Sequence, residues 1–221
     1  MSATLATTIT PDTVISFEIN PGTLLQFLET RPEGRPRLKC YQGSVTLVSP
    51  GKPHETAGFR LDRLILAVCL ELRIRHTVLG STTWKLPFGA GDTAYEADQA
   101  YYVQSHGTAN DRQPPDLAVE IVVTNPEKKA LLAGAVLRIP ELWVLDVPRH
   151  RLTFHHLTTR GKNKGTYRAK PTSRAFPILR PDELLERLDD PEPDDTAFHE
   201  NCRAWARKVL VPRTLAPKGG D

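Results

Sequence analysis

The chain has 221 residues, of which 39% are hydrophobic and 25% charged, with a formal net charge of +3 and an isoelectric point near 8.8. These totals favour one soluble α+β domain with extra terminal elements, and the mild basicity permits nucleic-acid binding without requiring it. The longest apolar stretch, Leu64–Leu70, is too short to span a membrane. Three cysteines without a CxxC spacing argue against disulfides and structural zinc, and together with the absence of a signal peptide they favour a reducing cytoplasm.

Hydrophobic periodicity and turn residues predict strands and helices in alternating groups along the chain. The predicted helices cover residues 23–28, 54–74, 126–137, 181–188 and 197–209. The predicted strands cover residues 37–42, 44–48, 82–86, 95–103, 116–123, 142–147 and 151–157, and residues 162–170 are expected to form a basic loop or a strand. Residues 1–36 are expected to form an N-terminal extension, residues 37–210 the domain, and residues 211–221 a flexible tail. This order predicts an α+β fold with a largely antiparallel sheet.

Two acidic residues, Asp98 and Glu120, interrupt apolar runs that are otherwise typical of strands. Carboxylates are rare inside such runs because burying an unpaired charge is costly. A divalent metal, or a proton shared between the two groups, would stabilise them there. The separation of 120 − 98 = 22 residues leaves room for a loop between two antiparallel strands.

On its predicted strand, Glu120 shares a face with Ala118 and Val122, which leave room for a metal and water. Two carboxylates on neighbouring strands form a hard oxygen site suited to Mg²⁺ or Mn²⁺. Such a site can polarise a phosphodiester and lower the pKa of a bound water. The pattern therefore favours metal-dependent phosphodiester hydrolysis.

A metal site of this kind also needs a cation that orients the water or stabilises developing charge. Lys128 and Lys129, in the first turn of the helix after Glu120, are the nearest candidates in the sequence. His54 and Glu55 begin the long predicted helix. There His54 projects onto the apolar stripe, and Glu55 projects onto its border, so both could extend the site.

Structural interpretations stay open for each of these residues. Asp98 could cap or pair at a strand end, and Glu120 could belong to a buried salt bridge. Lysines in a first helical turn are usually solvated. His54 could be a hydrogen-bonded core histidine, and Glu55 a first-turn acid favoured by the helix dipole.

Five segments in the same order resemble the Uma-type restriction endonuclease family, a bacterial group within the PD-(D/E)XK phosphodiesterase superfamily. The resemblance covers roughly residues 20–210. The segments are Ser49-Pro-Gly-Lys-Pro-His-Glu55, Glu96-Ala-Asp-Gln-Ala-Tyr-Tyr102, Pro114-Pro-Asp-Leu-Ala-Val-Glu-Ile121, Ile139-Pro-Glu-Leu-Trp143 with Asp146, and Ser173-Arg-Ala-Phe-Pro177.

The resemblance implies a restriction-endonuclease-like fold, with a central mixed sheet flanked by helices. It implies that Asp98 and Glu120 bind the metal and that the reaction is Mg²⁺-dependent cleavage of DNA. A homodimer would let such an enzyme cut both strands of a duplex.

The sequence departs from the family pattern in the part that activates the water. The superfamily lysine falls at Val122, and the lysine that replaces it in the family falls near Ala130. Lys39 stands where the family usually has Glu, and Ala97 where it usually has Pro. We therefore keep two main hypotheses: a nuclease that uses Lys129 or Lys128, and a degenerate nuclease fold that binds nucleic acid or protein without turnover. A third, weaker hypothesis is hydrolysis of some other phosphodiester.

Overall fold

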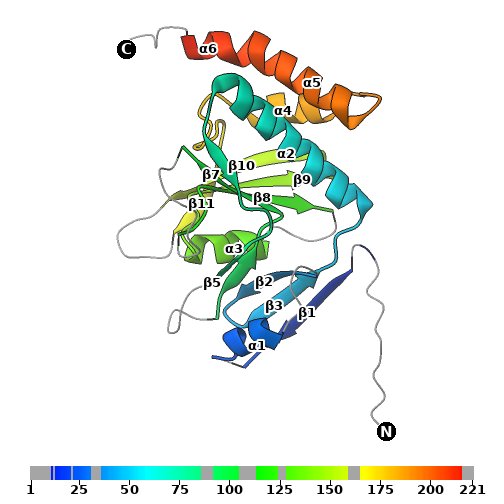
Figure 1. Cartoon of the computed structure of the whole chain (residues 1–221). Coiled ribbons are helices and arrows are strands. Elements are labelled where there is room, and N and C mark those ends of the chain that lie inside the picture. The colour runs from blue at the N-terminus through cyan, green and yellow to red at the C-terminus, as the bar shows by residue number, and fades with distance from the viewer. Residues whose placement is uncertain are drawn as a thin grey trace.

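The structure is a computed structural model that describes residues 11, 13–20, 22–30, 36–85, 92–104, 113–123, 128–158 and 165–215. It combines two sheets with helices in a mixed α+β architecture (Figure 1). The first sheet is antiparallel and has five strands in the order β1-β3-β2-β6-β5. Its strands are β1 (Val14–Glu18), β2 (Arg37–Tyr41), β3 (Ser44–Val48), β5 (Thr83–Lys85) and β6 (Ala94–Glu96).

The second sheet is mixed and has six strands in the order β11-β10-β9-β8-β7-β4. The pair β8 and β9 is parallel, and the other pairs are antiparallel. Its strands are β4 (His76–Val78), β7 (Gln99–Val103), β8 (Leu117–Val122), β9 (Glu141–Asp146), β10 (Arg151–Thr158) and β11 (Thr166–Lys170). Strands β8 and β9 are buried at every position, as expected for central strands covered on both faces.

Helices cover both faces of the second sheet. On one face the long helix α2 carries the terminal helices, and on the other face α3 lies between this sheet and the first one (Figure 1). The helices are α1 (Leu24–Thr30), α2 (Lys52–Leu72), α3 (Lys128–Val136), α4 (Pro181–Leu188), α5 (Asp195–Trp205), the π-helical turn η1 (Ala206–Leu210) and α6 (Val211–Leu215). The described helices include none that is long and apolar enough to cross a membrane.

The predicted fold class is confirmed, but one predicted strand is divided between the two sheets. The run 95–103 forms β6 in the first sheet and β7 in the second, with Ala97 and Asp98 at the break. Apolar periodicity continues across this break, so it gives no local signal. The division is what brings the two sheets together at Asp98.

Three other elements differ from expectation. Strands β1 and β4 were not predicted, because short strands at sheet edges carry weak alternation. Residues 211–215, predicted to begin the tail, are helical as α6. The π-helical turn η1 ends two residues before Pro212, which lacks a backbone N–H group. The predicted helix start at 124–127 and the tail residues 216–221 lie outside the described residues.

The three cysteines are free and buried in the core. Burial raises the pKa of the Cys69 and Cys202 thiols to about 12, and it also raises the pKa of Cys40. Because the thiolate is the reactive form, we expect none of the three to react with DTNB in the native protein at pH 8. All three should react in guanidinium chloride. Rapid native labelling of any cysteine would contradict this packing.

Glu141 is fully buried at the start of β9 and accepts hydrogen bonds on both oxygens. Its donors are Trp143 Nε1 at 2.9 Å, Ser173 Oγ at 3.1 Å, and the backbone N–H groups of Arg174 and Ala175 at 3.0 and 2.7 Å. This carboxylate therefore holds the segment after β11 against the sheet.

We expect Glu141→Ala to lower the free energy of unfolding by about 3 kcal/mol, because it leaves several buried donors without an acceptor. Urea denaturation measures the loss. Glu186→Ala, on the exposed side of α4, is the matched control and should change stability by less than about 0.5 kcal/mol. Equal effects of the two substitutions would contradict the structural role of Glu141.

Candidate active site

Asp98 lies at the bend between β6 and β7, where the chain passes from the first sheet to the second. Its backbone N–H donates to the Val119 carbonyl at 3.0 Å, so the residue lies beside β8. The Ile121 N–H in turn donates to Asp98 Oδ2 at 2.6 Å. These two bonds fix the carboxylate next to the middle of β8. Only 5% of the residue is exposed.

Glu120 is fully buried in the middle of β8. Its Oε1 accepts a hydrogen bond from the Tyr95 hydroxyl at 2.6 Å, and its Oε2 accepts one from Lys39 Nζ. Tyr95 and Lys39 are cross-strand partners on β6 and β2 of the first sheet. An acid of the second sheet is therefore held by two residues of the first.

Arg37 and the first turn of α2 surround Asp98 on its other side. Arg37 Nη1 donates to Asp98 Oδ1, and its Nη2 lies 3.2 Å from Glu55 Oε1. His54 is buried, with Nε2 3.1 Å from Asp98 Oδ2. From helix α2, His54 therefore contacts Asp98 directly, whereas Glu55 is linked to Asp98 through Arg37.

The charges in this cluster balance one another. Burial by itself would lower the pKa of Lys39, but the charges of Glu120 and Asp98 and the hydrogen bond to Glu120 together outweigh it, so the pKa is raised and the ammonium stays charged. The pKa of Asp98 is lowered although burial opposes this, because His54, Lys39 and Arg37 favour the carboxylate. Burial and then the charge of Asp98 raise the pKa of Glu120. Of the two acids, Glu120 is therefore protonated more easily than Asp98.

The two lysines chosen from the sequence, Lys128 and Lys129, have other surroundings than Glu120. Lys129 Nζ donates to Ser44 Oγ at 3.1 Å and to Thr46 Oγ1 at 2.6 Å, both on β3. Lys128 is exposed at the start of α3. The cation that contacts Glu120 is Lys39.

Sequence reasoning missed Lys39, Arg37 and Tyr95 as members of the site. Lys39 contacts Glu120 from β2 of the first sheet. Strand alternation with Leu38 and Cys40 favours an exposed Lys39, so its burial had no local signal in the sequence. The partner of such a lysine cannot be identified without the pairing of the two sheets.

The profile of the family described as "Putative restriction endonuclease", Uma2, matches residues 24–192 of the chain. The chain belongs to the Uma2 family. A similar fold is found in the crystal structure of "a putative nuclease belonging to DUF820" from Anabaena variabilis ATCC 29413. That structure shares 17% sequence identity at a TM-score of 0.51 and covers 75% of this chain and 98% of its own. No curated protein matches the chain.

The donors of this Uma2 site suit a hard divalent ion only in part. Mg²⁺ is usually held by one or two carboxylates together with water and substrate phosphates, which Asp98 and Glu120 could supply. Within the described residues, no group of three or more His, Cys, Asp or Glu side chains is placed to hold a metal ion. All four carboxylate oxygens already accept a protein hydrogen bond. Each carboxylate oxygen has a second lone pair, but an ion bound there would lie beside the Lys39 ammonium or the Arg37 guanidinium and would compete with that cation for the acid.

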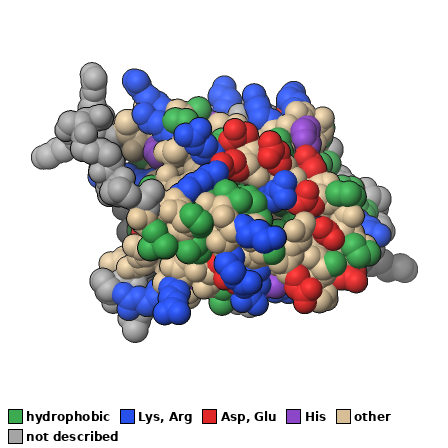
Figure 2. Space-filling model, turned by 90° about the horizontal axis from the view of Figure 1, so that it is seen from above, with side chains coloured by type: hydrophobic (Ala, Val, Ile, Leu, Met, Phe, Trp, Pro, Cys, Tyr) green, Lys and Arg blue, Asp and Glu red, His purple; other side chains and the backbone are tan. Residues whose placement is uncertain are grey.

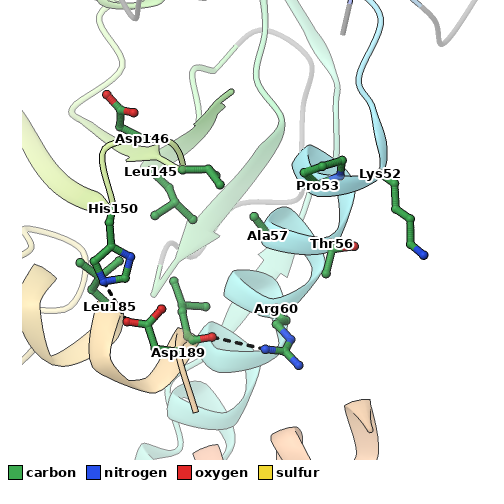
Figure 3. Close-up of a pocket in the computed structure, with 12 residues that line it drawn as sticks. Lys52, Pro53, Thr56, Ala57, Arg60, Leu145, Asp146, His150, Leu185 and Asp189 are labelled. Atoms are coloured by element: carbon green, nitrogen blue, oxygen red, sulfur yellow. Dashed lines mark hydrogen bonds and ion pairs between the residues drawn. The ribbon is translucent and has the colours of Figure 1, made fainter. Parts of the chain in front are cut away.

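A separate apolar pocket of about 400 Å³ lies between α2, the end of β9 and α4 (Figure 3). Two contacts connect the elements that line this pocket. His150 Nε2 lies 2.9 Å from Asp189 Oδ2, and Arg60 Nη1 donates to the Leu188 carbonyl at 3.4 Å. Leu145, Leu185 and Ala57 supply apolar surface. Neither Asp98 nor Glu120 lines this pocket, so it is distinct from the acid cluster.

Proposed function

We propose that this Uma2 protein is a cytoplasmic Mg²⁺- or Mn²⁺-dependent endonuclease that hydrolyses DNA phosphodiesters. The observation that carries the proposal is the convergence of Glu120 from β8, Lys39 from β2 and Asp98 from the bend between β6 and β7 in one buried cluster. The family profile and the nuclease-like fold support a nuclease class of function. Buried acids beside a lysine are the groups that phosphodiester hydrolysis uses.

In this proposal Asp98 and Glu120 hold the ion. When bound, a divalent ion polarises the phosphodiester and lowers the pKa of a water molecule. Lys39 takes the role that the sequence suggested for Lys129 or Lys128, because its ammonium already lies at Glu120. Once Glu120 turns away from it, Lys39 can donate to the attacking water or to the oxygen on which charge develops.

The remaining neighbours position these groups. Tyr95 keeps its proton, because burial raises its pKa well above the usual value, and so it donates to Glu120 Oε1. His54 and Arg37 orient Asp98, and Glu55 orients Arg37. Two copies of the chain would be needed to cut both strands of a duplex in one encounter.

One observation favours a second candidate, a degenerate nuclease fold that binds nucleic acid or protein without turnover. Lys39 and Arg37 already neutralise the two acids, as in a buried salt-bridge cluster that needs no metal. The two candidates differ in whether the acids exchange these partners for an ion.

Nicking of supercoiled plasmid distinguishes the candidates. We expect nicking with Mg²⁺ or Mn²⁺ and none with excess EDTA, in parallel with a Glu120→Gln preparation that controls for contaminating nucleases. Equal nicking by that control would remove the support for this site. Absence of nicking with either ion would favour the degenerate fold.

A further inference from the structure

A cleft of about 390 Å³ opens between the first sheet and α3 and reaches the same lysine that contacts Glu120. Three lysines line it, Lys39, Lys128 and Lys129, together with hydroxyl groups of β1 and β3. None of the described residues that line it is acidic. Because Lys39 is paired with Glu120, Lys128 and Lys129 supply the net positive charge of the cleft, which with the hydroxyl groups suits an anion.

Strand register gives this cleft a direction. Ser16 is the cross-strand partner of Thr46, Thr46 is the partner of Lys39, and Lys39 is the partner of Tyr95. Directly opposed residues share a face of a sheet, so these four polar side chains form one row across β1, β3, β2 and β6. The row ends at Glu120, which accepts hydrogen bonds from both Lys39 and Tyr95.

Lys129 extends this row from the opposite wall. Its ammonium is fixed by two hydroxyl acceptors, Thr46 Oγ1 and Ser44 Oγ, and Thr46 Oγ1 also lies 3.0 Å from Ser16 Oγ. An ammonium has three protons to donate, so one remains beyond these two bonds. A positioned cation with a remaining donor, beside hydroxyl groups, suits a phosphate oxygen.

Among the described residues, the cavity on the side of the cluster nearest Asp98 is much smaller. The cavity lined by Arg37, His54 and Asp98 has a volume of about 10 Å³, which is about the space of one water molecule. A phosphodiester cannot enter there without rearrangement. The cleft on the Lys39 side is the roomier approach to Glu120.

We propose that this cleft binds the phosphodiester backbone of a nucleic acid, with Lys129, Thr46 and Ser44 holding a phosphate that neighbours the one at Glu120. The inference rests on the proposed function for the class of substrate, and it assigns Lys129 to substrate binding. It predicts that the nucleic-acid strand crosses the face formed by β1, β3 and β2 before it reaches Asp98 and Glu120.

Binding of a fluorescently labelled DNA duplex in EDTA, followed by anisotropy over a series of salt concentrations, tests the proposal. Lys129→Met should weaken binding about tenfold and reduce the slope of log K against log salt by about one. Thr46→Val should weaken binding about threefold, and Lys129→Arg should restore most of the affinity. Thermal unfolding of each variant checks that the fold is kept.

Lys208→Met is the matched control, because Lys208 is an exposed lysine of η1, far from the cleft in the fold. The face formed by the terminal helices has interspersed basic and acidic side chains (Figure 2). There Arg203 and Arg207 pair with Glu71 of α2. This control should change duplex affinity by less than about twofold.

Two outcomes would overturn the inference. One is an equal loss of affinity in Lys129→Met and Lys208→Met, which would show binding by general charge. The other is that the wild-type protein binds no duplex, although it binds inorganic phosphate titrated alone or added as a competitor. The binding test is made in EDTA and needs no turnover, so it is independent of the nicking test. A protein that binds duplex through Lys129 but does not nick plasmid would contradict the proposed function alone. A protein that nicks plasmid but binds duplex without Lys129 would contradict this inference alone.

Discussion

Lys39→Met is expected to lower the rate of metal-dependent DNA nicking by about a hundredfold or more. The substitution keeps most of the side-chain volume but removes the cation that contacts Glu120. Loss of one positioned group that stabilises transition-state charge typically costs a factor of about 10² to 10³. Single-turnover cleavage of an end-labelled duplex measures the effect.

Stability must be followed in the same variants, because Lys39→Met also leaves Glu120 without its cation. Removing one partner of a buried ion pair costs about 3–5 kcal/mol, whereas Lys39→Met combined with Glu120→Gln should recover much of this loss. Lys39→Arg retains the charge and should keep more activity than Lys39→Met. A Lys39→Met protein that folds and cuts within threefold of wild type would refute the role of Lys39.

Asp98→Asn and Glu120→Gln should each reduce nicking by about 10³-fold, because each removes one of the two proposed ion ligands. Residues that act as a unit are strongly non-additive, so the double variant should be little worse than either single one. Rates with saturating Mn²⁺ measure these effects.

Asp116→Asn is the matched acid control. Asp116 Oδ2 accepts a hydrogen bond from the Val103 N–H at 2.8 Å, a bond that an asparagine oxygen can replace. We expect this variant to cut at a rate close to that of wild type. A comparable loss in Asp116→Asn, or additive losses in Asp98→Asn and Glu120→Gln, would argue against a shared ion site.

The two acids could be chosen from the sequence because a carboxylate inside an apolar run is locally visible. Asp98 and Glu120 are both buried and both belong to one cluster. His54 could also be placed, because helical periodicity fixes the face on which it lies, and it does face Asp98. Their roles in binding and catalysis stay predictions.

The cation could not be chosen in the same way. Lys128 and Lys129 were selected for their closeness to Glu120 along the chain, whereas Lys39 is separated from it by 81 residues and lies in another sheet. The contact depends on the break at Asp98, which sends β6 to one sheet and β7 to the other. Neither hydrophobic period nor turn chemistry reports such a break.

Glu141 shows the limit of arguments from buried charge. It is as deeply buried as Glu120 and also lies within a strand. Its partners are mainly backbone N–H groups and the Trp143 indole, so it is satisfied without a cation of the acid cluster. A buried acid becomes a candidate for catalysis through its neighbours, and these come from the tertiary fold.

Calorimetric titration of Mn²⁺ into four proteins tests the central claim most directly: wild type, Asp98→Asn, Glu120→Gln and Lys39→Met. The proposed site predicts one bound ion per chain in wild type, loss of that ion in both acid variants, and retained or tighter binding in Lys39→Met, where the competing ammonium is gone. Equal binding by all four proteins, or none even in Lys39→Met, would contradict a metal site at Asp98 and Glu120.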